Sequence, residues 1–395
     1  MKRYVVLTAV MATVVALALA VVQHRESRGS TPVRLTRAAA PVEDVQSGTR
    51  AHTPPVPEPP HQAPTASPTT QVSSVATAAP TVSMTSSAPA SLTASNRSTP
   101  GTPRWIRQEA GLGGNYLNGV FFVDAAHGWA VGGWNGTIRA TVDGGRTWQA
   151  QTSGTQAELT GVSFVDANHG WAVGFAGTVL VTFNGGLTWT PQHAPAGDYL
   201  AVSFVDRKHG WAVGNCGVIS ATTDGGATWV SQVPPPAPVV CDRPMLTGVK
   251  FVTRTDGWAV GGDTILHTTD GGASWTSQSD VGTGLYDVFF IDRTRGWVVG
   301  LNSIILATGD GGRTWSAQDP GATHIALLGV VFAGPQKGWT VGIDWSGGGE
   351  GVILGTTDGG RTWSREAADA TMILRGVSAA GANQAWAVGT GVLAR

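Results

Sequence analysis

The stretch that decides the fold is Asp256-Gly257-Trp258-Ala259-Val260-Gly261, followed shortly by Thr268-Thr269-Asp270-Gly271-Gly272-Ala273-Ser274-Trp275. Both segments recur along the chain. The Trp of the first segment stands at positions 129, 171, 211, 258, 297, 339 and 386, at spacings of 39 to 47 residues. The second segment follows each of the first six and ends at Trp148, Trp189, Trp229, Trp275, Trp315 and Trp363. Self-similarity at a period of about 42 residues is typical of a repeat architecture.

Each unit contains four short apolar runs separated by turn residues, which predicts four strands. In the second unit we place them at residues 159–166, 170–174, 178–182 and 188–192. Seven such units predict an all-β, seven-bladed β-propeller over residues 104–395. The seventh unit lacks the second motif, whereas Trp105 near the front matches the residue that ends it. We therefore expect the N-terminal strand to close the ring by pairing with the C-terminal strands.

The second motif, Thr-x-Asp-Gly-Gly-x-Thr/Ser-Trp, has the composition of a tight turn. Its Asp, or Asn184 in the second unit, can accept bonds from backbone N–H groups, and its two Gly permit positive φ. Its hydroxyl side chains can bond locally, and its Trp is expected to pack between blades. Six copies at near-constant spacing indicate structure and not catalysis.

The first 104 residues differ in composition from the rest, with no Trp, 3 of the 55 Gly and 13 of the 22 Pro. After Met1-Lys2-Arg3, residues 4–22 form an uncharged apolar run close to the length that spans a bilayer. This run, within residues 1–28, is either an uncleaved membrane anchor helix or a signal peptide. Residues 29–103 are rich in Pro, Ser, Thr and Ala, which predicts a disordered stalk.

The overall composition limits the kinds of partner. Lys and Arg total 25 against 26 Asp and Glu, giving a formal net charge of −1. A chain near neutrality is not expected to bind nucleic acid. No zinc, phosphate-binding or nucleophile motif is present, so we predict no cofactor, no metal and no catalytic residue.

The repeated motifs carry a resemblance to known families. The second motif resembles the Asp-box, or BNR repeat, of sialidases, xyloglucan-cleaving glycosidases and sortilin-type receptors. The fuller unit, Asp256 to Trp275, resembles the photosystem II assembly and stability factor family of cyanobacteria and plastids. That resemblance implies a non-enzymatic propeller that binds newly made reaction-centre protein on the lumenal side of a membrane. Fold alone does not establish such a role.

Propeller geometry places the connections after the second and fourth strands of each blade on one face. Trp134 and Trp345, the two Trp outside the repeat positions, fall in such connections, and exposed aromatic side chains suit a binding surface. Cys216 and Cys241 lie on the same face in consecutive connections. A disulfide between them is expected, with two free thiols as the alternative, and it would indicate an oxidising compartment.

The opposite face carries cationic residues in four successive blades: Arg207, Arg254, Arg293, Arg295 and Lys337. They form either a docking surface for an acidic partner or a solvated rim that Asp206, Asp256 and Asp292 neutralise.

Two function hypotheses follow. The first is a membrane-anchored, extracytoplasmic propeller that binds protein partners, with membrane proteins under assembly as the partners that the resemblance implies; it is secreted if the apolar run is cleaved. The alternative is a glycan-binding or glycan-cleaving propeller, in which Asp344 and Glu350 flank Trp345 as acid, base and stacking platform. A sialidase is disfavoured because its Arg-Ile-Pro signature is absent.

Overall fold

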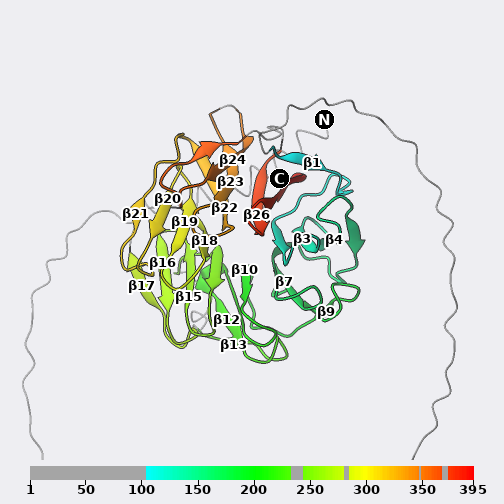
Figure 1. The fold of residues 1–395 in the computed structure, drawn as a ribbon. Helices are drawn as coiled ribbons and strands as arrows, with labels where there is room; N and C mark the ends of the chain where they lie inside the picture. The colour runs from blue at the N-terminus through cyan, green and yellow to red at the C-terminus, as the bar shows by residue number, and fades with distance from the viewer. Residues whose placement is uncertain (1–103, 233–242, 280–283, 347, 367–371) are drawn as a thin grey trace, which may run out of the picture. The chain divides into compact units, whose positions relative to one another are not determined.

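The computed structural model describes residues 104–232, 243–279, 284–346, 348–366 and 372–395. They form seven four-stranded antiparallel sheets arranged as blades in a ring (Figure 1), which confirms the predicted propeller. The innermost strands line a central channel. The predicted anchor and stalk, residues 1–28 and 29–103, lie outside the described residues. Among the described residues no helix is long and apolar enough to cross a membrane.

The first three blades run outward from the channel in chain order. They contain β2 (Gly119–Phe122), β3 (Gly128–Gly132), β4 (Thr137–Thr141) and β5 (Gln149–Gln151); β6 (Leu159–Phe164), β7 (Gly170–Gly174), β8 (Val179–Thr182) and β9 (Thr190–Pro191); and β10 (Tyr199–Phe204), β11 (Gly210–Gly214), β12 (Ile219–Thr222) and β13 (Val230–Ser231). A single 3-10 turn, η1 (Asn215–Gly217), joins β11 to β12.

The next three blades repeat this order and the sixth has longer inner strands. They contain β14 (Gly248–Phe251), β15 (Gly257–Gly261), β16 (Thr264–Thr268) and β17 (Thr276–Ser279); β18 (Leu285–Phe290), β19 (Gly296–Gly300), β20 (Ile305–Thr308) and β21 (Ser316–Ala317); and β22 (Ile325–Phe332), β23 (Gly338–Asp344), β24 (Glu350–Thr356) and β25 (Ser364–Arg365).

The seventh blade joins the two ends of the propeller domain. It contains β26 (Leu374–Ala380), β27 (Gln384–Gly389) and β28 (Val392–Ala394), and its fourth strand is β1 (Ile106–Gln108). Ile106 pairs with Ala394 and Gln108 with Val392, so the predicted closure by the N-terminal strand is confirmed. Figure 1 shows the cyan β1 beside the red C-terminal strands.

The strand limits predicted for the second unit are right for β7 and too long for its neighbours. β6 ends at Phe164 because Asp166 already belongs to a turn, where its carboxylate accepts the N–H groups of Asn168 and His169 at 2.8 and 2.9 Å. β9 holds only two residues, and the second is Pro191, which has no N–H to extend a ladder.

Aromatic stacks between neighbouring blades form the core. In six of the seven interfaces the Trp of the Gly-Trp motif stacks on a Phe of the next blade, and the Trp of the turn motif meets that Phe edge-on. Trp171, Phe204 and Trp229 show the pattern, with ring centres 3.5 and 5.9 Å apart. The Phe ring also explains why Gly precedes the Trp in the Gly-Trp motif, because a Cβ on Gly210 would lie 2.2 Å from Phe204.

The interface between the sixth and seventh blades departs from this pattern. Ala379 opposes Ala385 where the other blades pair Phe with Gly, so Trp339 has no Phe to stack on. The guanidinium of Arg395 lies 5.1 Å from the Trp339 ring centre and makes an ion pair with Glu366 at 3.0 Å. A buried cation therefore takes the place of the missing aromatic ring.

The turn motif has the predicted chemistry. Asp143 accepts the N–H of Thr147 at 2.9 Å and its hydroxyl at 2.7 Å, while Gly144 and Gly145 adopt φ of 74° and 87°. Hydrogen bonds from Thr147 hold the pKa of Asp143 at about 2. In addition, Trp386 of the seventh blade donates its indole N–H to the Gly144 carbonyl at 2.9 Å, so the turn also ties two blades together.

Candidate functional site

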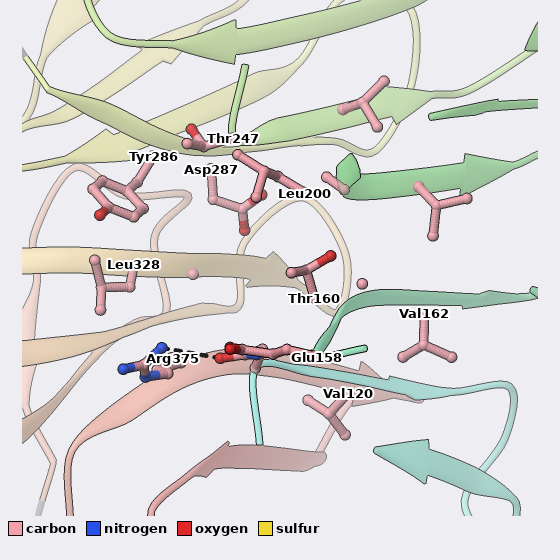
Figure 2. Close-up of a pocket in the computed structure, with 18 of the residues that line it drawn as sticks. Val120, Glu158, Thr160, Val162, Leu200, Thr247, Tyr286, Asp287, Leu328 and Arg375 are labelled. Atoms are coloured by element: carbon pink, nitrogen blue, oxygen red, sulfur yellow. Dashed lines mark hydrogen bonds between the residues drawn. The ribbon is translucent and has the colours of Figure 1, made fainter. Parts of the chain in front are cut away.

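The innermost strands present one variable side chain per blade at one mouth of the channel. A version of Leu-x-Gly-Val stands in or just before the first half of each of these strands, and x is Asn118, Thr160, Leu200, Thr247, Tyr286, Leu328 or Arg375. In five blades the ladder register shifts across x, as between Leu159 and Gly161. Such bulges re-aim a side chain, and all seven x residues line one cavity of about 370 Å³ (Figure 2).

Small residues form the next ring and explain why the blades can meet there. These positions are Gly119, Gly161, Ala201, Gly248, Asp287, Gly329 and Gly376, and all but Gly248 line the cavity. A Cβ on Gly161 would lie 3.3 Å from the Ala201 Cα, and one on Gly248 would lie 3.0 Å from the Asp287 Cα. Asp287 is therefore the one large side chain in a ring that close packing otherwise limits to Gly and Ala.

Asp287 is held in the channel by backbone groups and faces a buried cation from the neighbouring blade. It accepts the N–H of Val288 at 2.9 Å and that of Val330 at 3.0 Å. Burial raises its pKa to about 6, against the lowering effect of these bonds and of Lys250. Burial lowers the pKa of Lys250, whose ammonium lies 5.0 Å from the Phe289 ring centre. Asp287 and Lys250 both stand where the other blades have uncharged residues, and they belong to adjacent blades. The attraction between their charges offsets part of the free-energy cost of burying each of them.

A chain of contacts links the channel mouth to the exposed Trp134. Arg375 donates to the side-chain oxygen of Asn118 at 3.0 Å, and Asn118 donates to Glu158 at 2.8 Å. The Arg375 guanidinium lies 4.8 Å from the Tyr116 ring centre, and Tyr116 meets Trp134 edge-on at 6.4 Å. Burial, followed by the Glu158 charge, raises the pKa of Tyr116 to about 12, so its hydroxyl stays protonated.

Aliphatic and hydrogen-bonding side chains lie next to one another around the mouth. Leu200, Leu328, Met245 and Phe175 line it together with the polar members of the ring. Figure 2 shows Tyr286 and Arg375 on either side of Leu328. The Tyr286 hydroxyl makes no hydrogen bond within the described residues, and burial raises its pKa to about 12. The cavity thus offers uncommitted donors beside aliphatic surface, which suits a peptide segment.

The two Trp that were predicted to be exposed differ in their exposure. Trp134 is 59% exposed and belongs to the face on which the channel mouth opens. Trp345 was expected to be exposed but is half-buried, because it packs against the Ile343 and Ile373 side chains. The long β23–β24 hairpin provides this extra apolar layer, which the other blades lack.

The carboxylate pair of the alternative hypothesis does not have the form of an acid–base pair. Asp344 is buried, accepts the Ser346 hydroxyl at 2.6 Å and makes an ion pair with Arg365. The hydrogen bond from Ser346 and the Arg365 charge hold its pKa below the usual range. Glu350 is exposed and stands opposite Asp344 in the β-ladder. A structural ion pair therefore accounts for Asp344.

The predicted cationic residues on the opposite face have partners. Arg207, Arg254 and Arg293 each reach back to an Asp in the turn of the preceding blade, at 2.9, 2.7 and 3.2 Å. Arg295 pairs with Asp292 of its own turn at 2.6 Å, and Lys337 donates to Asn383 at 2.7 Å. This arrangement corresponds to the neutralised rim and leaves little unpaired charge for an acidic partner.

Cys216 is disulfide-bonded in the structure, and its φ is 56°. The other cysteine of the chain, Cys241, lies outside the described residues, so its pairing with Cys216 stays a prediction. In the described part of the chain no three His, Cys, Asp or Glu residues gather in a way that would hold a metal ion.

Sequence reasoning missed the ring at the channel mouth, although the signal is present. The Leu-x-Gly-Val pattern varies freely at x in all seven units, and Asp287 replaces its Gly once. A position that varies inside an otherwise constant repeat is where a scaffold can carry a site.

Comparisons with known proteins place this geometry in context. The family model described as photosynthesis system II assembly factor YCF48 matches residues 148–201, 196–279 and 276–385, which together span more than half of the chain. No curated protein matches the chain. A solved structure described as YCF48 bound to D1 peptide is 22% identical, with a TM-score of 0.59, over 74% of this chain and 95% of that one.

Two further solved structures show the breadth of the fold. YCF48 from Cyanidioschyzon merolae is 20% identical, with a TM-score of 0.61, over 74% of this chain and 98% of that chain. A GH74 xyloglucanase from Xanthomonas campestris is 16% identical, with a TM-score of 0.60, over 74% of this chain and 53% of the enzyme. At these identities the likeness concerns the fold, and function depends on the site.

Proposed function

The chain belongs to the family of the photosynthesis system II assembly factor YCF48, and on that premise we propose that its propeller is a non-enzymatic domain that binds a segment of a partner polypeptide at the channel mouth. The observation that carries this proposal is the ring of seven non-repeat side chains around one cavity. The YCF48 structure bound to a D1 peptide supports a polypeptide as the class of ligand. The ion pair of Asp344 with Arg365 supports a role without catalysis.

The binding mode follows from the chemistry of the mouth. An aliphatic side chain of the partner enters between Leu200 and Leu328, and its carbonyl or carboxylate oxygen accepts from Arg375 and Tyr286. Trp134 and Tyr116 extend the contact outward along the same face. Hydrogen bonds to a charged donor contribute about 1.5–3 kcal/mol, so Arg375 is expected to account for about a tenfold to hundredfold change in affinity.

A binding measurement with a D1 peptide tests the proposal. The full-length chain is titrated with the labelled peptide, and the dissociation constant is compared for wild type, Arg375→Ala and Leu200→Glu. Arg207→Ala is the matched control, because it removes an Arg from the opposite face. We expect both mouth variants to weaken binding at least tenfold and the control to leave it unchanged. Absence of binding by the wild type, or equal loss in the control, would contradict the proposal.

We also propose that the propeller works outside the cytoplasm, tethered by residues 4–22 or released by their cleavage, on membrane proteins under assembly. The disulfide at Cys216 supports an oxidising compartment. An alkaline phosphatase fused after Arg395 should be active in a bacterial host. An inactive fusion with normal expression would reverse the assignment.

A further inference from the structure

An apolar patch stands on the face opposite the channel mouth. Val142 is 67% exposed, Phe183 61% and Leu187 84%. All three belong to the turn motifs of the first two blades, Val142 to the first and the other two to the second. They make up half of the six large, exposed apolar side chains among the described residues. Val142 and Leu187 line one groove, and Phe183 lies in the same turn as Leu187, with its ring edge-on to His169 at 5.9 Å. Apolar side chains gathered on one face mark interaction surfaces more often than scattered ones do.

The repeat itself shows that the turn does not need these residues. At the position of Val142 and Phe183 the other four turns carry Thr or Gly, and at the position of Leu187 the other five carry Arg or Ala. The turn keeps the same hydrogen bonds in all cases, as Thr182 and Thr222 show by accepting the N–H of Gly186 and Gly226 at 2.8 Å each. The apolar residues therefore have a role other than turn formation.

The turn of the second blade, which carries Phe183 and Leu187, also lacks the negative charge of the other turns. Asn184 stands where the other five turns have Asp. Its amide reproduces the turn, because its oxygen accepts the Thr188 N–H at 3.0 Å and its nitrogen donates to the Thr188 hydroxyl at 2.9 Å. The carboxylates nearby have partners within their own turns. Asp143 accepts the Thr147 hydroxyl at 2.7 Å, and Asp124 and Asp166 contact the Nδ1 atoms of His127 and His169 at 2.9 and 2.8 Å. An uncharged partner would bury this surface without desolvating a free carboxylate.

A groove of about 290 Å³ runs between the first two blades beside the patch. Val142 and Leu187 line it, and so do the side-chain amides of Gln149 and Asn168. Neither amide makes a hydrogen bond within the described residues. An apolar rim over free amides suits a polypeptide, which has apolar side chains and a hydrogen-bonding backbone, better than a lipid surface, which has no backbone to bond.

We propose that this face docks an uncharged segment of a partner polypeptide that is rich in aliphatic or aromatic residues. One apolar side chain of the segment enters the groove between Val142 and Leu187, and its backbone bonds to Gln149 and Asn168. Phe183 packs against the segment beside the groove. This surface is separate from the channel mouth, so the propeller can hold two polypeptide segments on opposite faces.

Peptide selection with matched variants tests the proposal. Random peptides displayed on phage are selected on the immobilised full-length chain, and the enriched peptides are then titrated against three proteins. Phe183→Thr/Leu187→Ala carries the residues that the third blade has at these positions, Thr223 and Ala227, so its turn is expected to fold. Val230→Thr is the control, because it removes an exposed apolar side chain from the outer strand β13, outside the patch and the channel mouth.

We expect a class of uncharged, apolar peptides that binds the double variant at least tenfold more weakly than wild type and binds Val230→Thr as tightly as wild type. Three results would overturn the proposal. They are that every enriched peptide is charged, that the double variant binds with wild-type affinity, or that the patch instead controls binding to phosphatidylcholine vesicles or self-association in sedimentation.

Discussion

Asp287 makes a prediction about how stability depends on pH. Its pKa is raised from 3.8 to about 6 by burial in the channel. Because the folded state binds this proton more tightly than the unfolded state does, the carboxyl group favours folding at low pH, and that contribution is lost as pH rises through about 6. A gap of about 2 pKa units corresponds to at most about 3 kcal/mol.

The test compares wild type with Asp287→Asn. The amide has nearly the same shape, keeps one oxygen to accept the N–H of Val288 or Val330, and does not titrate. Free energies of unfolding are measured in urea at a series of pH values between about 4 and 8. We expect the wild type to lose about 3 kcal/mol relative to the variant across this range, with most of the change between pH 4 and 6.

Other titrating groups do not obscure the comparison. The Asp residues of the turn motifs have lowered pKa values, so their contributions are lost below about pH 4 and lie outside the range. Burial lowers the pKa of His267, which acts in the opposite direction but is common to both proteins. Lys250→Met provides a second check, because removing its charge should move the transition to higher pH. A difference that stays constant with pH would refute the reasoning.

Three further predictions concern the scaffold. Gly170→Ala should lower the free energy of unfolding by several kcal/mol, because its Cβ would lie 2.3 Å from the Phe164 ring. Phe164→Ala alone should cost about 3–5 kcal/mol. In a double-mutant cycle, Gly170→Ala should cause no further loss once Phe164 is Ala. Arg395→Met should cost about 3 kcal/mol in urea unfolding through loss of a buried ion pair, whereas Arg207→Met should change stability by about 0.5 kcal/mol or less. Cys216→Ser should lower stability by about 2–4 kcal/mol under oxidising conditions and have no effect when reductant is present.

The propeller could be predicted from the sequence because its determinants are local and repeated. The turn motif carries its own hydrogen-bond partners within four residues, as Asp143 and Thr147 show. The Gly before each Trp of the first motif is required by a Phe on the neighbouring strand of the same blade. In the seventh blade Ala379 replaces this Phe, and the Gly is replaced by Ala385. Seven copies of such a unit predict the number of blades, and the match between Trp105 and the repeat predicts the closing strand.

The candidate site could not be predicted in the same way, because it depends on contacts between distant residues. Asn118 and Arg375 are 257 residues apart, and they meet only because closure brings the first and seventh blades together. The same holds for the neutral rim, in which Arg254 pairs with Asp206 of the preceding blade. Trp345 was expected to be exposed because the repeat pattern shows a longer connection in the sixth blade but not that its Trp packs against Ile343 and Ile373.

The sequence by itself determined the repeat, the blade number and the way the ring closes, since each rests on short-range turn chemistry and strand pairing. The tertiary structure decided which residues face one another across the channel. The variable residues of all seven units line the mouth, in five blades at a bulge, and the closed ring brings Lys250 of the fourth blade close enough to Asp287 of the fifth to lower its pKa. A functional surface of this kind exists only after the ring is closed, because each blade contributes only one of the seven variable x residues.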